Sequence, residues 1–206
     1  MKLCVPYKFW EAAMMVAAKD DVRYYLNGVH LVDNKIESTN GHMCYQAKIR
    51  ESEGKLQTNN GSDEFDNTWP DIIISPVGAA PAASVKSKTV WLHIQDVDDD
   101  NGFNLVIYYV DATYNVLHIQ PANSIDGRFP DVNRVIPTKK KKPTEAFQIG
   151  FNPEYLAMPK KLLFREKKFS SLIMEAYSQN ESCKIEFRRP ATEAEQEILI
   201  IMPIRL

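Results

Sequence analysis

The sequence predicts an α+β fold in which a small module of one helix and antiparallel strands occurs three times along 206 residues. One observation behind this prediction is the repeated order of patterns: each part of the chain combines one helical pattern with several short strand-like runs. The other is the turn chemistry between the runs, including Asn-Gly pairs at 27–28 and 40–41. Helices covering one face of antiparallel sheets would let both kinds of element bury their apolar sides.

Residues 1–55 form the first predicted module. Pro6 suits the first turn of a helix over 7–19, and the apolar face of this helix contains Phe9, Ala13, Val16 and Ala17. Strand-like runs follow at 23–26, 29–32, 35–39 and 43–49. We interpret the unit as strand, helix and three antiparallel strands.

A polar loop at 56–70 leads to the second module, at 71–137. Strands are predicted at 71–75, 89–96, 103–111 and 115–120, with a weak, alanine-rich helix at 76–88. The stretch Ile125–Pro137 follows, in which Gly127 and two prolines restrict the backbone. We interpret it as a strand end that leads into a crossing between domains.

The third module, at 146–206, follows a lysine-rich linker at 138–145. A short strand at 146–150, a helix at 153–165 and strands at 169–177, 183–187 and 198–202 repeat the pattern.

The composition excludes several classes of protein. A formal net charge of −2 argues against a generally basic protein that coats nucleic acid. Three widely spaced cysteines form neither a disulfide framework nor a zinc set, and favour a reducing compartment. The N-terminus resembles a signal peptide only superficially, because Glu11 interrupts its apolar run, and we expect a soluble, cytoplasmic protein with no membrane partner.

No stretch of the sequence predicts catalysis. The acidic run from Asp96 to Asp100 lacks the glycine and the final glutamate of a calcium loop, so a solvated hairpin turn is the better interpretation. The four histidines are scattered, and nucleophile-elbow, P-loop and dinucleotide-binding motifs are missing from the sequence. We therefore expect no enzyme activity, no catalytic residues, no cofactor and no metal.

Basic residues gather on and after the third predicted helix. They are Lys160, Lys161, Arg165, Lys167 and Lys168, and the first helix adds Lys8 and Lys19. Such a set is either a solvated helix face or a face turned toward a phosphate backbone, and periodicity does not separate the two.

Five blocks, in this order, resemble the bacterial DNA polymerase III sliding clamp (β subunit): FWEAAMMVAAKDDVRYYLNGVHL, STNGHMC, IDGRFPDVNRVIP, IGFNPEYL and the terminal MPIRL. The resemblance implies a DNA-clamp fold of three strand–helix–three-strand repeats, where the family has six in each chain. Residues 1–137, with repeats at 1–55 and 71–137, are similar to the family's middle domain, and 146–206 is similar to the end of its last domain. The chain would be one full clamp-like domain plus a half domain, a shortened protein that a phage or mobile element could encode.

The resemblance also implies a pocket between these two parts that captures clamp-binding peptides of a DNA polymerase, clamp loader or repair protein. The implied pocket residues are Leu26, Thr39, Gly41, His42, Met43, Cys44, Pro130, Arg134, Val135, Asn152, Tyr155, Met202, Pro203, Ile204 and Arg205. Met43 and Cys44 depart from the arginine and leucine usual in the family at these positions.

Two roles follow from the resemblance. In the first, the protein is a sliding-clamp-like DNA replication accessory protein that binds such peptides as a recruiter or competitor. In the alternative, it is an oligomeric, DNA-encircling processivity factor, and the implied contacts to duplex DNA are Lys19, Tyr24, Tyr25, Lys160 and Lys161. A lone third repeat would leave a sheet edge and an apolar helix face uncovered, so we expect a homo-oligomer.

Overall fold

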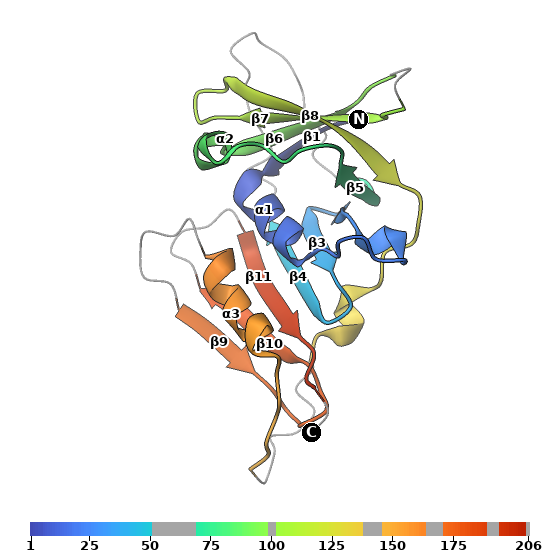
Figure 1. The fold of residues 1–206 in the computed structure, drawn as a ribbon. Coiled ribbons are helices and arrows are strands. Elements are labelled where there is room, and N and C mark those ends of the chain that lie inside the picture. Colours follow the sequence, from blue (N-terminus) through green and yellow to red (C-terminus); the bar gives the residue numbers. More distant parts are fainter. Residues whose placement is uncertain (51–68, 99–101, 138–145, 164–170, 189–193, 205–206) are drawn as a thin grey trace.

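One long antiparallel sheet runs through the protein, and its helices pack beside it (Figure 1). The computed structural model describes residues 1–50, 69–98, 102–137, 146–163, 171–188 and 194–204. The strands are β1 (Lys2–Pro6), β2 (Val29–Val32), β3 (Lys35–Thr39), β4 (Met43–Ile49), β5 (Ile72–Pro76), β6 (Trp91–Asp96), β7 (Leu105–Val110), β8 (Val116–Ile125), β9 (Ser171–Glu175), β10 (Cys183–Arg188) and β11 (Ala194–Ile201). The helices are α1 (Tyr7–Val16), α2 (Ala83–Lys88) and α3 (Pro153–Leu162), with 3₁₀ turns η1 (Tyr24–Leu26) and η3 (Val132–Val135).

The order of the eleven strands is β1-β6-β7-β8-β5-β2-β3-β4-β11-β10-β9. The first strand does not pair with its neighbours in sequence: β1 lies against β6, with Lys2 opposite Gln95. Strand β5 lies between β8 and β2 and so joins the two halves of the N-terminal part. Strand β4 pairs with β11, which continues the sheet into the C-terminal residues.

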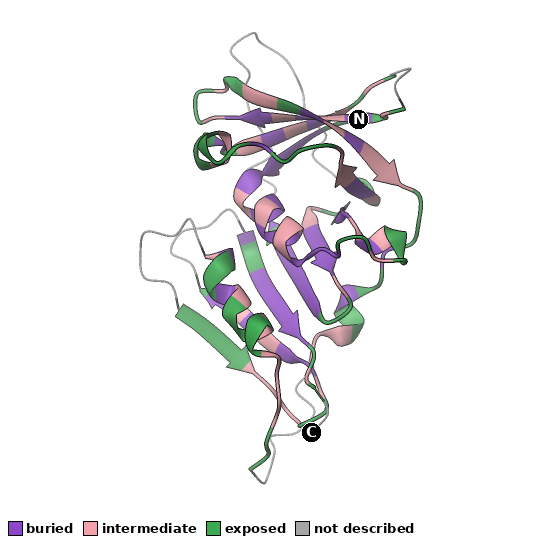
Figure 2. Ribbon diagram, in the orientation of Figure 1, coloured by how far each residue is buried: buried purple, intermediate pink, exposed green. Residues whose placement is uncertain are grey.

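The main apolar core lies on the face of the sheet that α1 covers (Figure 2). Phe9, Trp10 and Val16 of α1 are buried there, as the amphipathic pattern predicts. Tyr45 of β4 and Leu199 of β11 belong to the same core, as does Leu162 of α3. Because Tyr45 pairs with Leu199 in the sheet, the N-terminal and C-terminal parts share one core.

A second, smaller apolar cluster lies on the opposite face. Successive side chains of a strand point to opposite faces, so Cys44 faces away from Met43 and Tyr45. The members of this cluster, called the η3-side cluster below, are Cys44, Ile73, Phe129, Val132, Ile198 and Ile200, with Tyr25, Ile125, Val135 and Ile136 partly buried against them. The cluster therefore joins the stretch 125–137 to strands from both parts of the chain.

The architecture confirms an α+β fold with an antiparallel sheet, and most strands fall where the sequence predicts them. Cys4, Cys44 and Cys183 are all free and buried. No helix among the described residues is long and apolar enough to cross a membrane.

Two of the predicted strands are wrong. In place of a strand at 23–26, η1 forms at Tyr24–Leu26, because the Leu26 amide bonds to the Arg23 carbonyl (2.8 Å). The Asn27 side chain also bonds to both the amide and the carbonyl of Asp21. Residues 146–150 contribute only an isolated bridge, between Gly150 and Ile204.

Other boundaries shift for identifiable reasons. The strand predicted before the first helix, for which the sequence analysis gives no range, is β1. Strand β8 continues past the predicted end at 120, because Pro121 still pairs with Val106 of β7 and residues 122–125 pair with β5. Helix α2 is only six residues long, far shorter than predicted. The lysine-rich linker and, except for residues 69 and 70, the polar loop lie outside the described residues.

Candidate peptide-binding site

The β3–β4 turn is the most rigidly built part of the predicted pocket. The Asn40 side chain accepts hydrogen bonds from the amides of His42 (2.9 Å) and Met43 (2.8 Å). The Thr39 hydroxyl donates to the Met43 carbonyl (2.7 Å) and accepts from the Gly41 amide (3.1 Å). Gly41 has a φ of 86°, in the left-handed region that glycine adopts without steric cost. These contacts fix the backbone that presents His42.

Arg23 lies directly over this turn and is a residue that the sequence analysis missed. A Cβ on Gly41 would come within 2.9 Å of an Arg23 guanidinium nitrogen. Two hydrogen bonds to the Asp21 carboxylate, of 3.0 and 2.8 Å, orient the guanidinium. These bonds and one from the Arg23 amide lower the pKa of Asp21 to about 2, so the carboxylate stays ionised at neutral pH. No local signal in the sequence points from Arg23 to a turn at Gly41.

On the opposite face of the sheet, Cys44 and Val135 meet in the η3-side cluster. The Ser182 hydroxyl donates to the Val135 carbonyl (2.5 Å), which ties η3 to the residues just before β10. Burial raises the pKa of the Cys44 thiol, which therefore stays neutral. Pro130 and Arg134, from the same stretch, are exposed beside this cluster.

The C-terminal side of the predicted pocket is joined to the turn through the backbone. The Met202 amide bonds to the His42 carbonyl (2.9 Å), and the Ile204 amide bonds to the Gly150 carbonyl (2.9 Å). Both side chains are open to solvent, with Met202 39% and Ile204 50% exposed. Large apolar side chains at a strand end are available for contact with a ligand.

Helix α3 adds an aromatic contact to the turn. Asn152 begins the helix, and its side chain accepts a hydrogen bond from the Glu154 amide (2.9 Å). One turn later, the Tyr155 ring stacks on the His42 ring, with centroids 6.0 Å apart and planes at 21°. The structure thus brings His42, Tyr155 and Met202 together from three separate segments.

Other predicted pocket residues are structural parts of the wall. Leu26 is buried, and its carbonyl accepts a hydrogen bond from the Ala18 amide (3.1 Å). Met43 is buried in the main core, on the face opposite Cys44. Pro203 is half-buried, and Arg205 lies outside the described residues. The predicted set therefore divides between the two faces of the sheet and the ends of the paired strands β4 and β11.

A cavity of about 290 Å³ lies on the helix side, between α1, the β3–β4 turn and α3. Its lining includes Met43 and Tyr155 of the predicted pocket and two residues predicted to contact DNA, Lys19 and Lys161. Lys160, also exposed, is the neighbour of Lys161 on α3. Tyr24 and Tyr25 lie elsewhere: both approach Gly127, and Tyr25 packs against the η3-side cluster.

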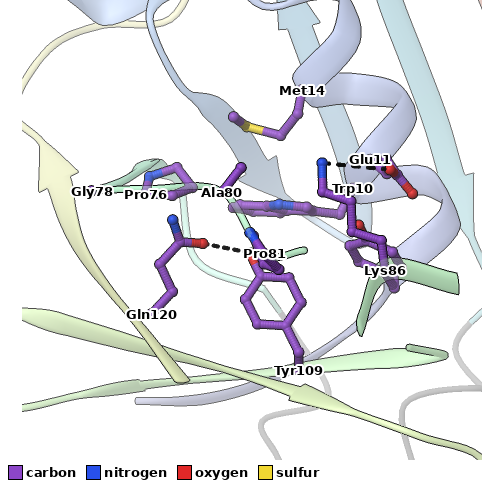
Figure 3. A pocket seen from close by; sticks show the side chains of 11 residues that line it. Trp10, Glu11, Met14, Pro76, Gly78, Ala80, Pro81, Lys86, Tyr109 and Gln120 are labelled. Atoms are coloured by element: carbon purple, nitrogen blue, oxygen red, sulfur yellow. Dashed lines mark hydrogen bonds and ion pairs between the residues drawn. The ribbon is translucent and has the colours of Figure 1, made fainter. Parts of the chain in front are cut away.

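A second cavity, of about 160 Å³, lies between α1 and the segment that joins β5 to α2 (Figure 3). Trp10, Tyr109 and Gln120 line it, and the Tyr109 hydroxyl donates to the Gln120 side chain (2.6 Å). None of the residues predicted to bind peptide or DNA lines this cavity. Across the described part of the chain, no group of three or more histidine, cysteine or acidic side chains is arranged to hold a metal ion.

The arrangement of strands and helices is that of the sliding clamps of bacterial DNA polymerases. The sliding clamp of Pseudomonas aeruginosa, solved with a ligand, matches all of this chain over 66% of its own, with a TM-score of 0.55 and 14% identity. The Helicobacter pylori β clamp, solved in complex with diflunisal, matches all of this chain over 66% of its own, with a TM-score of 0.56 and 11% identity. This chain thus spans just under two thirds of the length of these clamps.

At these identities, the similarity establishes the fold. It confirms, at that level, the family resemblance of the five sequence blocks. No protein-family model and no curated protein sequence matches the chain.

Proposed function

We propose that this protein is a sliding-clamp-type DNA replication accessory factor that binds clamp-binding peptides of DNA polymerase, clamp loader or repair proteins. The observation that carries the proposal is the clamp fold over the whole chain, in which the Met202 amide bonds to the His42 carbonyl. Through that bond, the exposed apolar residues Met202 and Ile204 of the C-terminal segment lie beside the β3–β4 turn. The protein would act as a recruiter or as a competitor for such peptides.

The chemistry of the surface suits a short peptide with leucine or phenylalanine anchors. Apolar clefts with a few polar groups capture such peptides, because burial of the anchors supplies affinity and the polar groups fix direction. Here Met202 and Val135 would contact the anchors, and the exposed Arg134 would pair with a peptide carbonyl or carboxylate. The stacked His42 and Tyr155 rings would support the far end of the peptide.

The domain organisation is part of the same proposal. Residues 1–137 would form a clamp-like domain of two repeats and residues 146–206 a half domain with a third, each with the order strand, helix and three strands. The order β5-α2-β6-β7-β8 supports the repeat in the second unit, whereas only the Gly150 bridge precedes α3 in the third.

A fluorescence titration with a labelled clamp-binding peptide of a DNA polymerase tests the function. We expect Met202→Ala to weaken binding about tenfold or more, since an exposed anchor contact at the centre of a peptide site is worth at least about 1.4 kcal/mol. The matched control is Ile119→Ala, because Ile119 is also exposed (54%) but lies on β8.

Arg134→Ala, compared with Arg128→Ala, provides a second matched pair, since both arginines are exposed on one stretch. The proposal predicts loss of affinity only for the Arg134 variant. If the intact protein does not bind the peptide, peptide capture is wrong.

An oligomeric, DNA-encircling factor remains a second candidate, and one observation favours it. Strand β9 is an edge of the sheet, and Leu172, Ile173 and Met174 along it are exposed by 39%, 39% and 55%. An edge strand with exposed apolar side chains is a template for pairing with another chain. The exposed lysines beside the helix-side cavity, Lys19 and Lys161, would then face the duplex.

Light scattering at several protein concentrations tests this candidate. We expect a mass above that of one chain and a shift toward the single chain in Ile173→Lys, because a charge at the paired edge disfavours strand addition. Val116→Lys is the control, since Val116 is exposed (52%) away from β9. A single-chain mass at every concentration would rule out the ring.

A further inference from the structure

A buried histidine joins three segments beneath the η3-side cluster. His30 of β2 is only 6% exposed, yet both of its ring nitrogens face carboxylates. Its Nδ1 lies 2.9 Å from Glu37 Oε2 on β3, and its Nε2 lies 2.8 Å from Asp71 Oδ1, just before β5. The other oxygen of Glu37 accepts a hydrogen bond from the Gln46 side chain (2.7 Å). None of these contacts belongs to the residues predicted to bind peptide.

This geometry specifies the charge of the ring. An ionised carboxylate only accepts hydrogen bonds, and a neutral imidazole carries one N–H, so a neutral His30 could satisfy one of its two partners. The Asp71 side chain is 81% exposed, so water solvates its carboxylate. Two simultaneous hydrogen bonds therefore require an imidazolium. Burial lowers the pKa of His30, but the hydrogen bonds and charges of Glu37 and Asp71 outweigh burial and raise it.

The ring also contacts the stretch 125–137. The Phe129 ring stacks on His30, with centroids 4.5 Å apart and planes at 21°. A cation on the face of an aromatic ring is attracted by the ring's quadrupole, so protonation strengthens this contact. Phe129 directly precedes Pro130 and belongs to the cluster that contains Cys44 and Val135. The charge of His30 is thus coupled to the wall of the proposed peptide site.

We infer that His30 is a positioning residue, whose imidazolium fixes the Phe129 segment and whose deprotonation loosens the peptide site as the pH rises. The inference rests on the proposed function for its effect on peptide binding, but the effect on Phe129 does not depend on any ligand. Because Glu37 is buried and also holds Gln46, the neutral ring keeps its bond to Glu37 and loses the one to Asp71. Asp71, just before β5, then loses its side-chain contact with β2, while the backbone pairing of the two strands remains.

Carboxylates and a thiol from the neighbouring elements surround His30. Glu37 on β3 and Asp71 before β5 are the carboxylates that face it. The Cys44 thiol lies on β4, near Glu37. Burial raises the pKa of this thiol, and the charge of Glu37 raises it further. On the Phe129 segment, the charged side chains Asp126, Arg128 and Asp131 are exposed to solvent.

The direction of the pH effect follows from the raised pKa. A group whose pKa is higher in the folded than in the unfolded protein stabilises the fold fully below the unfolded value, about 6.5 for histidine. That contribution is lost as the pH rises through the folded-state pKa of His30. Stability and peptide affinity should therefore both decrease as the pH rises above about 6.5 and through the folded-state pKa of His30.

The test combines three measurements on the intact protein from about pH 5.5 to about pH 9.5. Nuclear magnetic resonance of the labelled His30 ring gives its titration midpoint, and a fluorine label on the Phe129 ring reports the segment. The same labelled polymerase peptide gives the affinity at each pH. We expect the Phe129 signal to shift with the His30 midpoint and the affinity to fall about fivefold or more across it.

Asp71→Asn is the informative variant, because its side chain is exposed and its loss leaves the core intact. We expect it to move the His30 midpoint, and with it the Phe129 transition, to lower pH. Asp126→Asn, an exposed carboxylate on the Phe129 segment, should leave both unchanged.

The outcomes separate this inference from the proposed function. The inference is wrong if His30 titrates with a midpoint at or below the ordinary histidine pKa, even if the peptide binds. It is also wrong if the Phe129 signal does not change across the His30 titration. A peptide affinity independent of pH while His30 titrates would overturn its role at the site. If both ring signals behave as expected and no peptide binds at any pH, the proposed function fails and the coupling of His30 to Phe129 stands.

Discussion

Leu199→Ala is expected to lower the free energy of unfolding by about 2–5 kcal/mol, the range for truncating a buried leucine. Leu199 is fully buried at the β4–β11 pairing, opposite Tyr45, in the core shared by the N-terminal and C-terminal parts. The cavity left by the substitution has α1 and two central strands around it, so collapse of the core cannot fill it cheaply. Urea denaturation followed by circular dichroism measures the change.

The number of unfolding transitions of Leu199→Ala tests whether the N-terminal and C-terminal parts share one core. If residues 146–206 are a half domain that depends on the rest, the variant should unfold in one transition at a lower midpoint. Leu172→Ala is the control, because Leu172 is 39% exposed on the edge strand β9 and should change stability by less than about 0.5 kcal/mol. A separate early transition in Leu199→Ala would contradict the shared core.

Gly28→Ala is expected to destabilise the protein by about 3 kcal/mol, near the upper end for an overpacked site. A Cβ at this position would lie 2.8 Å from the Ile74 carbonyl oxygen and 2.9 Å from Ile73 Cγ2. The first of these atoms is backbone in β5, which is held between β8 and β2 and cannot move without breaking strand pairing. Thermal and urea unfolding both measure the loss.

Gly127→Ala is the matched comparison for this glycine. Its Cβ would lie 3.0 Å from Tyr25 Cβ, a tight contact, but Gly127 is exposed and lies outside the strands. The connecting segment can shift by a few tenths of an ångström, so we expect about 1 kcal/mol. Equal losses in the two variants would show that the close approach of β2 and β5 is not the cause.

The sequence predicted elements whose signals are local. The apolar stripe of α1, the Asn40-Gly41 turn and the alternation along β4 each lie within a few residues, and each gives the observed element. The failures have physical reasons as well. Tyr24 and Tyr25 favour a strand by intrinsic preference, but the hydrogen bonds of the Asn27 side chain to the Asp21 backbone close the chain into a turn.

Only part of the candidate site could be predicted from the sequence, because its contacts join distant segments. The family resemblance supplied the turn and the C-terminal residues, and the structure brings His42, Tyr155 and Met202 together. Arg23 over Gly41 and Ser182 on the Val135 carbonyl depend on how separate elements pack, which no spacing in the sequence encodes. The same holds for His30 and Asp71, which are 41 residues apart.

The pairing of β1 with β6 has a consequence for synthesis of the chain. The Met1 amino group bonds to the Asp96 carboxylate, 95 residues later, so the first strand is made long before its partner. At about 5–20 residues per second, β1 waits roughly 5–20 s for β6 on a translating ribosome. Strand β5, which joins the two halves, is made before β6, so the interior of the sheet can begin to pair while its edge strand is unprotected. Until β6 is made, β1 is therefore an unpaired apolar strand that chaperones could bind.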